Sequence, residues 1–150
     1  MSERFATCIS IGGKLHRRDL PRLLETIRAA DVACDWGDAA FKPHSGDELV
    51  ADLKGRKLWL CNDEAGWGEF PALENTCRAL RLAYTRRSDG GVAYDADVVE
   101  WRPGMREPLV RVGSNQCHTT FVPTSDVAQA LRHLEAGRIT HARALLRTLC

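Results

Sequence analysis

Apolar side chains recur along the chain at two spacings, every second residue and every third or fourth, which are the periods of strands and of amphipathic helices. Alternation over Phe5–Ile11 predicts a first strand, and an apolar stripe between Asp19 and Ala30 predicts a helix with Asp19 as its cap. A second short strand is predicted over Val32–Trp36. Together these elements make a strand–helix–strand (βαβ) unit over about residues 5–36.

The same order of elements recurs fifty residues later. Residues 20–33 align without gaps with residues 70–83, and the strand Phe5–Ile11 aligns with Gly55–Cys61. The two aligned segments share a proline, a leucine, a threonine, an arginine and two alanines. A second βαβ unit is therefore predicted over about residues 55–87. The pattern predicts an α+β fold, with ferredoxin-like duplicated βαβ units in one mixed sheet, added β-hairpins and C-terminal helices.

Local signals predict the remaining elements. The segment Ser45-Gly46-Asp47-Glu48 has the spacing of a capping box and predicts a helix between the two units. Residues 62–69 are predicted to be a loop, residues 83–122 to be rich in strands, and residues 124–150 to be helical. Turn residues predict two hairpins, which join 83–87 with 92–102 and 109–112 with 117–122.

Length and composition narrow the class of protein. A chain of 150 residues, 44% of them hydrophobic, is expected to form a single globular domain over residues 1–150. No apolar run reaches the roughly 20 residues that cross a bilayer, and the first residues do not resemble a secretory signal. We therefore expect a cytoplasmic protein. The six cysteines include no C-x-x-C pair and are expected to be free thiols.

The net charge of +1 conceals an uneven distribution. Residues 31–75 carry ten acidic and four basic side chains, whereas the segments before and after them are basic. A surface divided in this way favours a partner of complementary charge. It is not typical of a general nucleic-acid binder, whose net charge is usually well above zero.

The predicted loop at residues 62–69 contains the leading candidates for a site. Loops at strand ends often carry function, and this one combines three carboxylates with a tryptophan between glycines. The candidate partner-binding residues, here and after the short strand 32–36, are Asp63, Glu64, Trp67, Glu69, Trp36 and Asp38. As an alternative, Asp63, Glu64 and Glu69 are suited to a small metal-assisted hydrolase, in which carboxylates bind a metal or act as acid and base.

Arginines define a second candidate surface, in the strand-rich segment. The basic-patch candidates are Arg86, Arg87, Arg102, Arg106 and Arg111. They are a possible nucleic-acid interface, but the strands lack the aromatic pattern on which RNA-binding sheets stack bases. The chain also lacks a Walker loop and any zinc-ligand spacing, so no cofactor and no metal is predicted.

A further set of residues resembles a known kind of protein. It comprises Trp67-Gly68-Glu69-Phe70, Leu73-Glu74, Cys77-Arg78, Tyr84 and Trp101-Arg102-Pro103-Gly104-Met105. These segments resemble small uncharacterised proteins of bacteriophages and bacterial mobile elements. The resemblance implies a protein that binds and blocks a larger host protein, as anti-CRISPR and other counter-defence proteins do. We expect a non-enzymatic accessory or inhibitor protein, with the hydrolase and the nucleic-acid-binding module as alternatives.

Overall fold

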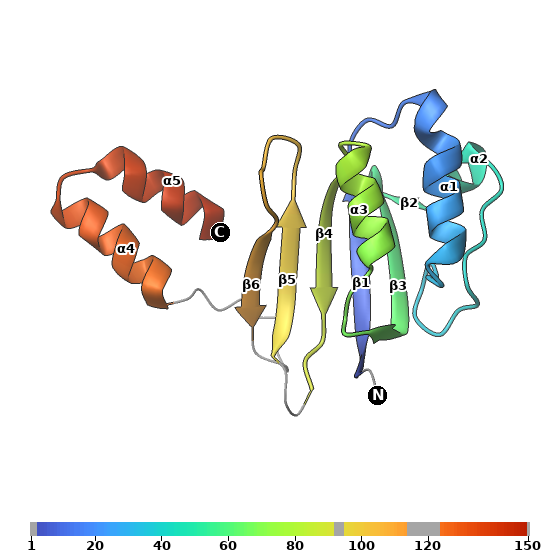
Figure 1. Ribbon diagram of the computed structural model, residues 1–150, viewed down its shortest axis with the longest axis horizontal. Helices are drawn as coiled ribbons and strands as arrows, with labels where there is room; N and C mark the ends of the chain where they lie inside the picture. The colour runs from blue at the N-terminus through green and yellow to red at the C-terminus, as the bar shows by residue number, and fades with distance from the viewer. Residues whose placement is uncertain (1–2, 92–94, 114–123, 150) are drawn as a thin grey trace.

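The computed structural model describes residues 3–91, 95–113 and 124–149, and six strands in these ranges form one antiparallel sheet in the order β2-β3-β1-β4-β5-β6 (Figure 1). The strands are β1 (Arg4–Gly12), β2 (Leu53–Lys54), β3 (Lys57–Gly66), β4 (Ala83–Ser88), β5 (Ala96–Trp101) and β6 (Leu109–Gly113). The helices are the short 3-10 turn η1 (Arg17–Asp19), α1 (Leu20–Ala29), α2 (Gly46–Ala51), α3 (Pro71–Ala79), α4 (Thr124–Glu135) and α5 (Ile139–Leu149).

The α+β class is confirmed, but the expectation of a mixed sheet is wrong. Strand β1 pairs antiparallel with both β3 and β4, so these two run parallel to each other with β1 between them. The helix α3 therefore joins two parallel strands that are not neighbours. Every neighbouring pair of strands described is consequently antiparallel.

The main core lies between the sheet and the helices α1 and α3, which pack side by side. On β1, the side chains of Thr7, Ile9 and Ile11 are buried while the residues between them are only half-buried. The helices bury their apolar stripes on this side of the sheet: Leu23, Leu24 and Ile27 from α1 and Leu73 and Cys77 from α3. Removal of these stripes from water is the main force that holds the helices on the sheet.

Three features of α1 and α3 recur fifty residues apart. The hydroxyl oxygens of Thr26 and Thr76 lie 3.1 Å apart, so residues at the same place in the two helices meet where the helices touch. Just beyond each helix, Asp31 and Arg81 adopt positive φ angles of 52° and 58°. The helices also share a proline in their first turn. Asp19 occupies the N-cap position of α1 as predicted, but its side chain makes no capping hydrogen bond.

The predicted strand over Val32–Trp36 is reduced to a single bridge. Ala33 pairs antiparallel with Cys61 of β3, and the chain then turns away from the sheet. The predicted capping box begins α2, because the Ser45 Oγ accepts a hydrogen bond from the Glu48 N–H. The short strand β2 then brings the chain back to the same edge of β3 through a tight turn, in which Gly55 and Arg56 both have positive φ.

The register of β1 and β3 changes the predicted equivalence of these strands. Ile9 lies opposite Leu60 and Ile11 opposite Leu58, and these four side chains are buried beneath the helices. Cys61 is one residue out of phase with Leu60 and faces the other side of the sheet. The alignment of Phe5–Ile11 with Gly55–Cys61 is therefore wrong by one residue, since a slip of one residue exchanges the two faces of a strand.

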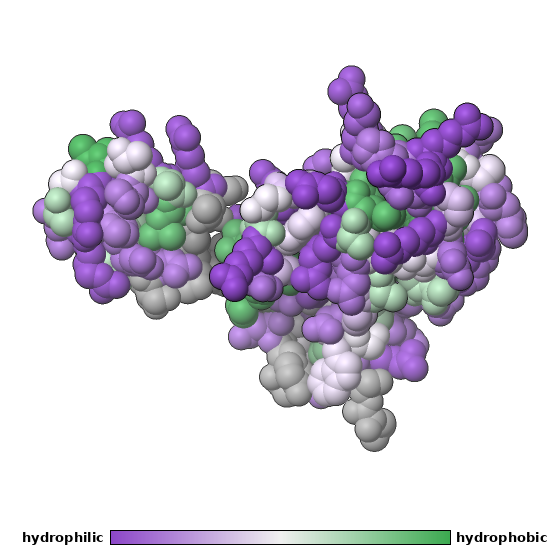
Figure 2. All heavy atoms as spheres, turned by 45° about the horizontal axis from the view of Figure 1, so that its top comes forward, coloured by the Kyte–Doolittle hydropathy of each residue, from purple (hydrophilic) through white to green (hydrophobic). Residues whose placement is uncertain are grey.

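The later part of the chain matches the prediction where the structure describes it. Strands β4 and β5 form the predicted hairpin, and β6 pairs with β5. The predicted partner at 117–122 lies outside the described residues. Helices α4 and α5 pack against each other, bury Ala130 and Ala142, and expose several apolar side chains, which Figure 2 shows in green. None of the helices in the described ranges is long and apolar enough to cross a membrane.

Candidate protein-binding surface

The carboxylates Asp63 and Glu64 lie on a strand and not in a loop. Strand β3 continues to Gly66 because β1 begins at Arg4, early enough to pair with it. The pairing contains a bulge, in which Asp63 and Glu64 together lie opposite Ala6. A bulge leaves one residue unpaired and re-aims the neighbouring side chains. Both carboxylates are exposed as a result.

Asp63 and Glu64 line a hollow of about 390 Å³ together with three further carboxylates. We call this the acidic hollow and define it by Asp31, Asp35, Asp38, Asp63 and Glu64. All five are exposed. Arg4 is the one basic side chain among the lining residues, and its guanidinium lies 3.6 Å from the Glu64 carboxylate. The hollow therefore has an excess of negative charge, which favours a cationic ligand or partner group.

The segment that follows Ala33 turns away from the sheet, and hydrogen bonds attach it to β3 at this hollow. The Gly37 N–H donates to the Asp63 Oδ2 at 3.1 Å, and the Asn62 side-chain amide donates to the Asp31 carbonyl at 2.7 Å. Within the turn, the Trp36 N–H donates to the Asp35 side chain. These contacts bring together carboxylates that are up to 33 residues apart, from Asp31 to Glu64.

Trp36 lies in the same turn, between Asp35 and Asp38, and its side chain is 44% exposed. Its ring packs edge-to-face on Trp59 with a centroid distance of 5.6 Å. The Lys54 Nζ lies 4.5 Å from the centre of the Trp59 ring, a cation–π contact. Trp36 is thus an exposed aromatic group held in place beside the acidic hollow, and exposed aromatics of this kind are frequent anchors in protein interfaces.

Trp67 and Glu69 belong to a different hollow, of about 310 Å³. It is lined by Phe5, Trp67, Glu69, Ser88, Asp89, Asp95 and Asp97. We call it the aromatic–acid hollow. Trp67 follows β3 with a positive φ of 57°, its N–H donates to the Glu3 carbonyl, and its side chain is 51% exposed. An aromatic ring beside carboxylates is a suitable environment for a cationic side chain.

The six candidate partner-binding residues are thus divided between two hollows. Asp38, Asp63 and Glu64 line the acidic hollow, with Trp36 in the same turn, whereas Trp67 and Glu69 line the aromatic–acid hollow. The hollows lie at the same end of the sheet, since consecutive residues of β1, Arg4 and Phe5, line one each. Sequence reasoning missed Asp31 and Asp35, although the acidic excess of residues 31–75 pointed to this region.

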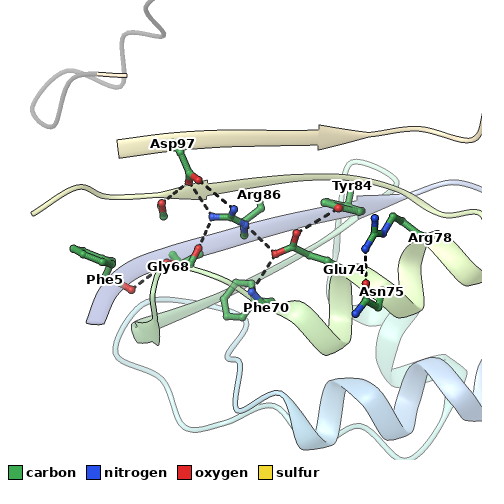
Figure 3. A network of polar contacts seen from close by, with 11 residues as sticks. Phe5, Gly68, Phe70, Glu74, Asn75, Arg78, Tyr84, Arg86 and Asp97 are labelled. Atoms are coloured by element: carbon green, nitrogen blue, oxygen red, sulfur yellow. Dashed lines mark hydrogen bonds and ion pairs between the residues drawn. The ribbon is translucent and has the colours of Figure 1, made fainter. Parts of the chain in front are cut away.

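Arg86 is not part of a basic surface patch. Its side chain is 4% exposed and lies between two carboxylates, Glu74 of α3 and Asp97 of β5 (Figure 3). The guanidinium forms two hydrogen bonds with Asp97, at 2.9 and 3.2 Å, and donates another to the Gly68 carbonyl. The Nε lies 2.9 Å from the Glu74 Oε1, but its proton is not aimed at that oxygen, so this contact is an ion pair without a hydrogen bond.

The partners of Arg86 are themselves held in place. Glu74 accepts hydrogen bonds from the Phe70 N–H at 3.1 Å and from the Tyr84 hydroxyl at 3.3 Å, and the Ser88 hydroxyl donates to Asp97. Burial, with a further contribution from the charge of Glu74, raises the pKa of Tyr84 to about 12. We call Glu74, Tyr84, Arg86, Ser88 and Asp97 the buried polar network. It joins α3, β4 and β5 and has a structural role.

The other four arginines do not form one cluster with Arg86. Arg111 is mostly buried and lies 3.3 Å from the Glu100 carboxylate. Arg87, Arg102 and Arg106 are exposed. Arg87 lies opposite Val98, four residues before Arg102, so these two positions are roughly 13 Å apart along β5. The predicted basic patch is therefore wrong as a five-residue surface.

The predicted set of catalytic carboxylates is also divided, because Asp63 and Glu64 line one hollow and Glu69 the other. In the described ranges, no group of three or more His, Cys, Asp or Glu side chains is placed to hold a metal ion. Comparisons of the chain with protein-family models, curated proteins and solved structures find no match. The fold and the hollows define an α+β protein with an acidic, tryptophan-bearing surface.

Proposed function

We propose that this chain is a non-enzymatic protein-binding protein that occupies a basic surface of a larger protein partner. The observation that carries the proposal is the acidic hollow, with five exposed carboxylates, one arginine and a tryptophan anchored beside it. Blocking the partner is the role that the resemblance to small phage and mobile-element proteins implies. Binding at the acidic hollow would block the partner if the partner uses the bound basic segment for another contact.

Charge and shape together support a lysine- or arginine-rich segment as the group recognised. Carboxylates of the acidic hollow supply the charge complementarity that steers association, and Trp36 supplies apolar contact area. The aromatic–acid hollow at the same end of the sheet offers a second place for a cationic side chain, because Phe5, Trp67 and several carboxylates line it. Two such places favour an extended basic segment over a single cation.

The proposal is tested with a peptide of alternating lysine and arginine, titrated into the full chain by calorimetry. The triple variant Asp35→Asn, Asp38→Asn, Asp63→Asn removes three charges but keeps the side-chain oxygen that the Gly37 N–H requires. At about 0.5–1 kcal/mol for each exposed charge contact, we expect affinity to fall roughly tenfold or more. Binding by the native chain should also weaken as salt is added.

A matched control removes three exposed carboxylates that line neither hollow: Glu25→Gln, Glu107→Gln and Glu135→Gln. This variant has the same net charge as the test variant and should bind the peptide nearly as well as the native chain. Equal losses in the two variants would mean that only overall charge matters. No binding of the basic peptide by the native chain would reject the proposal.

We also infer that β1, α1, β2, β3, α3 and β4 form a duplicated ferredoxin-like unit. The order β2-β3-β1-β4, with every pair antiparallel, is the order that two interleaved βαβ units give. An offset of 49 residues relates Ile9 to Leu58 and Gly12 to Cys61, and an offset of 50 relates Ala33 to Ala83. The same offsets relate the pair Gly12–Ala83 to the bridge Cys61–Ala33. The Thr26–Thr76 contact supports the same relation.

A further inference from the structure

Cys8 of β1 and Cys61 of β3 lie directly opposite each other in the sheet. The Ala33 N–H donates to the Cys61 carbonyl at 2.7 Å, and the Cys61 N–H donates to the Ala33 carbonyl at 2.8 Å. Both backbone polar groups of Cys61 therefore point away from β1. Cys8 and Cys61 are consequently a non-hydrogen-bonded pair, the kind in which opposite residues approach most closely, with Cα atoms about 4.5 Å apart.

The two thiols also share one face of the sheet. The next pair along, Ile9 and Leu60, faces the helices, so Cys8 and Cys61 face the other side. A Cα separation of about 4.5 Å is within the range of about 4.4–6.8 Å that a disulfide accepts. The Cβ atoms of such a pair are about 4.5–5.5 Å apart, so closure requires them to approach slightly. Both cysteines are free.

The surroundings make the two thiols unequal. Cys8 is half-buried and Cys61 is buried. Burial raises the pKa of both, that of Cys61 to about 12 with a further contribution from the charge of Asp63, whereas the positive charge of Arg87 partly opposes the rise at Cys8. Cys8 is therefore the thiol that meets a reagent first. Since thiolates are the reacting species, both steps should become faster at higher pH.

We propose that Cys8 and Cys61 are a modification site, which closes a reversible cross-strand disulfide by exchange with a low-molecular-weight disulfide. The Cys8 thiolate attacks one sulfur of the reagent and expels one thiolate, which leaves a mixed disulfide on Cys8. The Cys61 thiolate then attacks the Cys8 sulfur and expels the second thiolate. Two cysteine thiols are oxidised to one disulfide, and the reagent is reduced to two thiols that take up the two protons.

The consequence of the modification is a covalent link between β1 and β3, the two central strands of the sheet's β2-β3-β1-β4 part. The link closes a loop of more than fifty residues, from Cys8 to Cys61. A cross-link that closes a long loop stabilises a protein chiefly by restricting its unfolded chain, and strain in the bond reduces this stabilisation. The inference does not depend on the proposed binding function.

The test incubates the native chain with glutathione disulfide at pH 8.5, blocks the remaining thiols and maps the peptides by mass spectrometry. The expected product is a peptide pair that links residues 8 and 61, lighter than its reduced parts by the mass of two hydrogen atoms. The thermal unfolding midpoint should rise by several degrees and return after dithiothreitol treatment. Only glutathione adducts, only links between other cysteines, or no reaction would each overturn the proposal.

Two variants separate the steps. Cys61→Ser should stop the reaction at a mixed disulfide with glutathione on Cys8, and Cys8→Ser should abolish the internal link. Cys77→Ser is the matched control, because Cys77 lies in the helix-facing core and is not paired with either thiol. It should leave the 8–61 link intact. The mapping of the native chain remains decisive even if a variant fails to fold.

Discussion

Two stretches of the chain begin alike and end differently: residues 4–38, which we call the first unit, and residues 57–88, the second unit. Each has a central strand and a helix whose first turn contains a proline, and each then pairs an alanine, Ala33 or Ala83, with the other unit's central strand. After that alanine the second unit continues as β4, whereas the first unit turns away. The same framework thus supports an internal strand in one unit and an exposed acidic turn in the other.

The difference extends to the chemistry at matching positions. Under the proposed duplication, an offset of fifty residues relates Leu24 to Glu74 and Trp36 to Arg86. The second unit can bury an arginine because β5 lies beside β4 and supplies Asp97 as a counter-charge. The first unit has only the Ala33 bridge where the second unit has β4. Its carboxylates Asp31, Asp35 and Asp38 remain exposed and line the acidic hollow together with two carboxylates of the second unit. The neighbouring strand β5 therefore allows the second unit to bury the charged side chain of Arg86.

The largest expected effect comes from the arginine of the second unit. Arg86→Met leaves Glu74 with little exposure and no cation, and breaking one side of a buried ion pair costs about 3–5 kcal/mol. The matching change in the first unit, Trp36→Ala, removes a side chain that is 44% exposed and should cost about 1 kcal/mol or less. Urea unfolding of both variants measures the contrast. Similar small losses would show that the buried polar network is not needed for stability.

Two glycines give the next contrast. Gly68 has a φ of +66°, and a Cβ there would lie 2.7 Å from the Ser88 Cβ, so Gly68→Ala should destabilise the protein by about 2–3 kcal/mol. Gly37 has a φ of +76° but open space around it, so Gly37→Ala should cost only about 1 kcal/mol, the backbone strain alone. Chemical unfolding separates the two values. An equal cost at both sites would mean that the close approach at Ser88 relaxes easily.

Alkaline pH should act on the second unit through Tyr84. Its pKa of about 12 lies above the ordinary value of 10.0, so the folded state holds this proton more tightly than the unfolded state does. The stabilisation is present below pH 10 and is lost as the pH rises from 10 to 12. Tyr84→Phe should therefore reduce the fall in unfolding free energy over this range by about 2 kcal/mol. If the unfolding free energies of the native protein and the variant fall equally between pH 10 and 12, the raised pKa of Tyr84 is contradicted.

The smallest effect concerns the contact between the units. Thr26→Val or Thr76→Val leaves one partly buried hydroxyl without its partner across the helix pair, and each should cost about 1 kcal/mol. The double variant should cost less than the sum of the two, because both hydroxyls are then gone. A double-mutant cycle measures this coupling. Strict additivity would indicate that the two hydroxyls do not interact.

Local sequence signals were sufficient for some elements and insufficient for others. The helices α1 and α3 and the hairpin β4–β5 were predicted because apolar spacing and turn residues encode them locally. The extension of β3 through Asp63 and Glu64 was not, since carboxylates are poor strand formers and the partner strand β1 holds them there. The loss of the strand at 32–36 likewise depends on tertiary context.

The candidate site was predicted in part for the same reason. Acidic excess and strand-end position pointed to Asp38, Asp63 and Glu64, which share a hollow. Trp67 and Glu69 line a different hollow from these three residues, and this separation depends on where β1 begins. The burial of Arg86 depends on Glu74 and Asp97, which are twelve and eleven residues away along the chain. No local pattern carries information about such pairings.

The central claim is that the acidic hollow is a binding surface, and the chemical shifts of backbone amides test it most directly. Isotope-labelled protein is titrated with the lysine–arginine peptide and followed by two-dimensional NMR. The account predicts that the largest shift changes occur at Asp35, Gly37 and Asp63, with little change at Arg87 and Arg102. Shift changes centred on the arginine-bearing strands, or none at the acidic hollow, would contradict it.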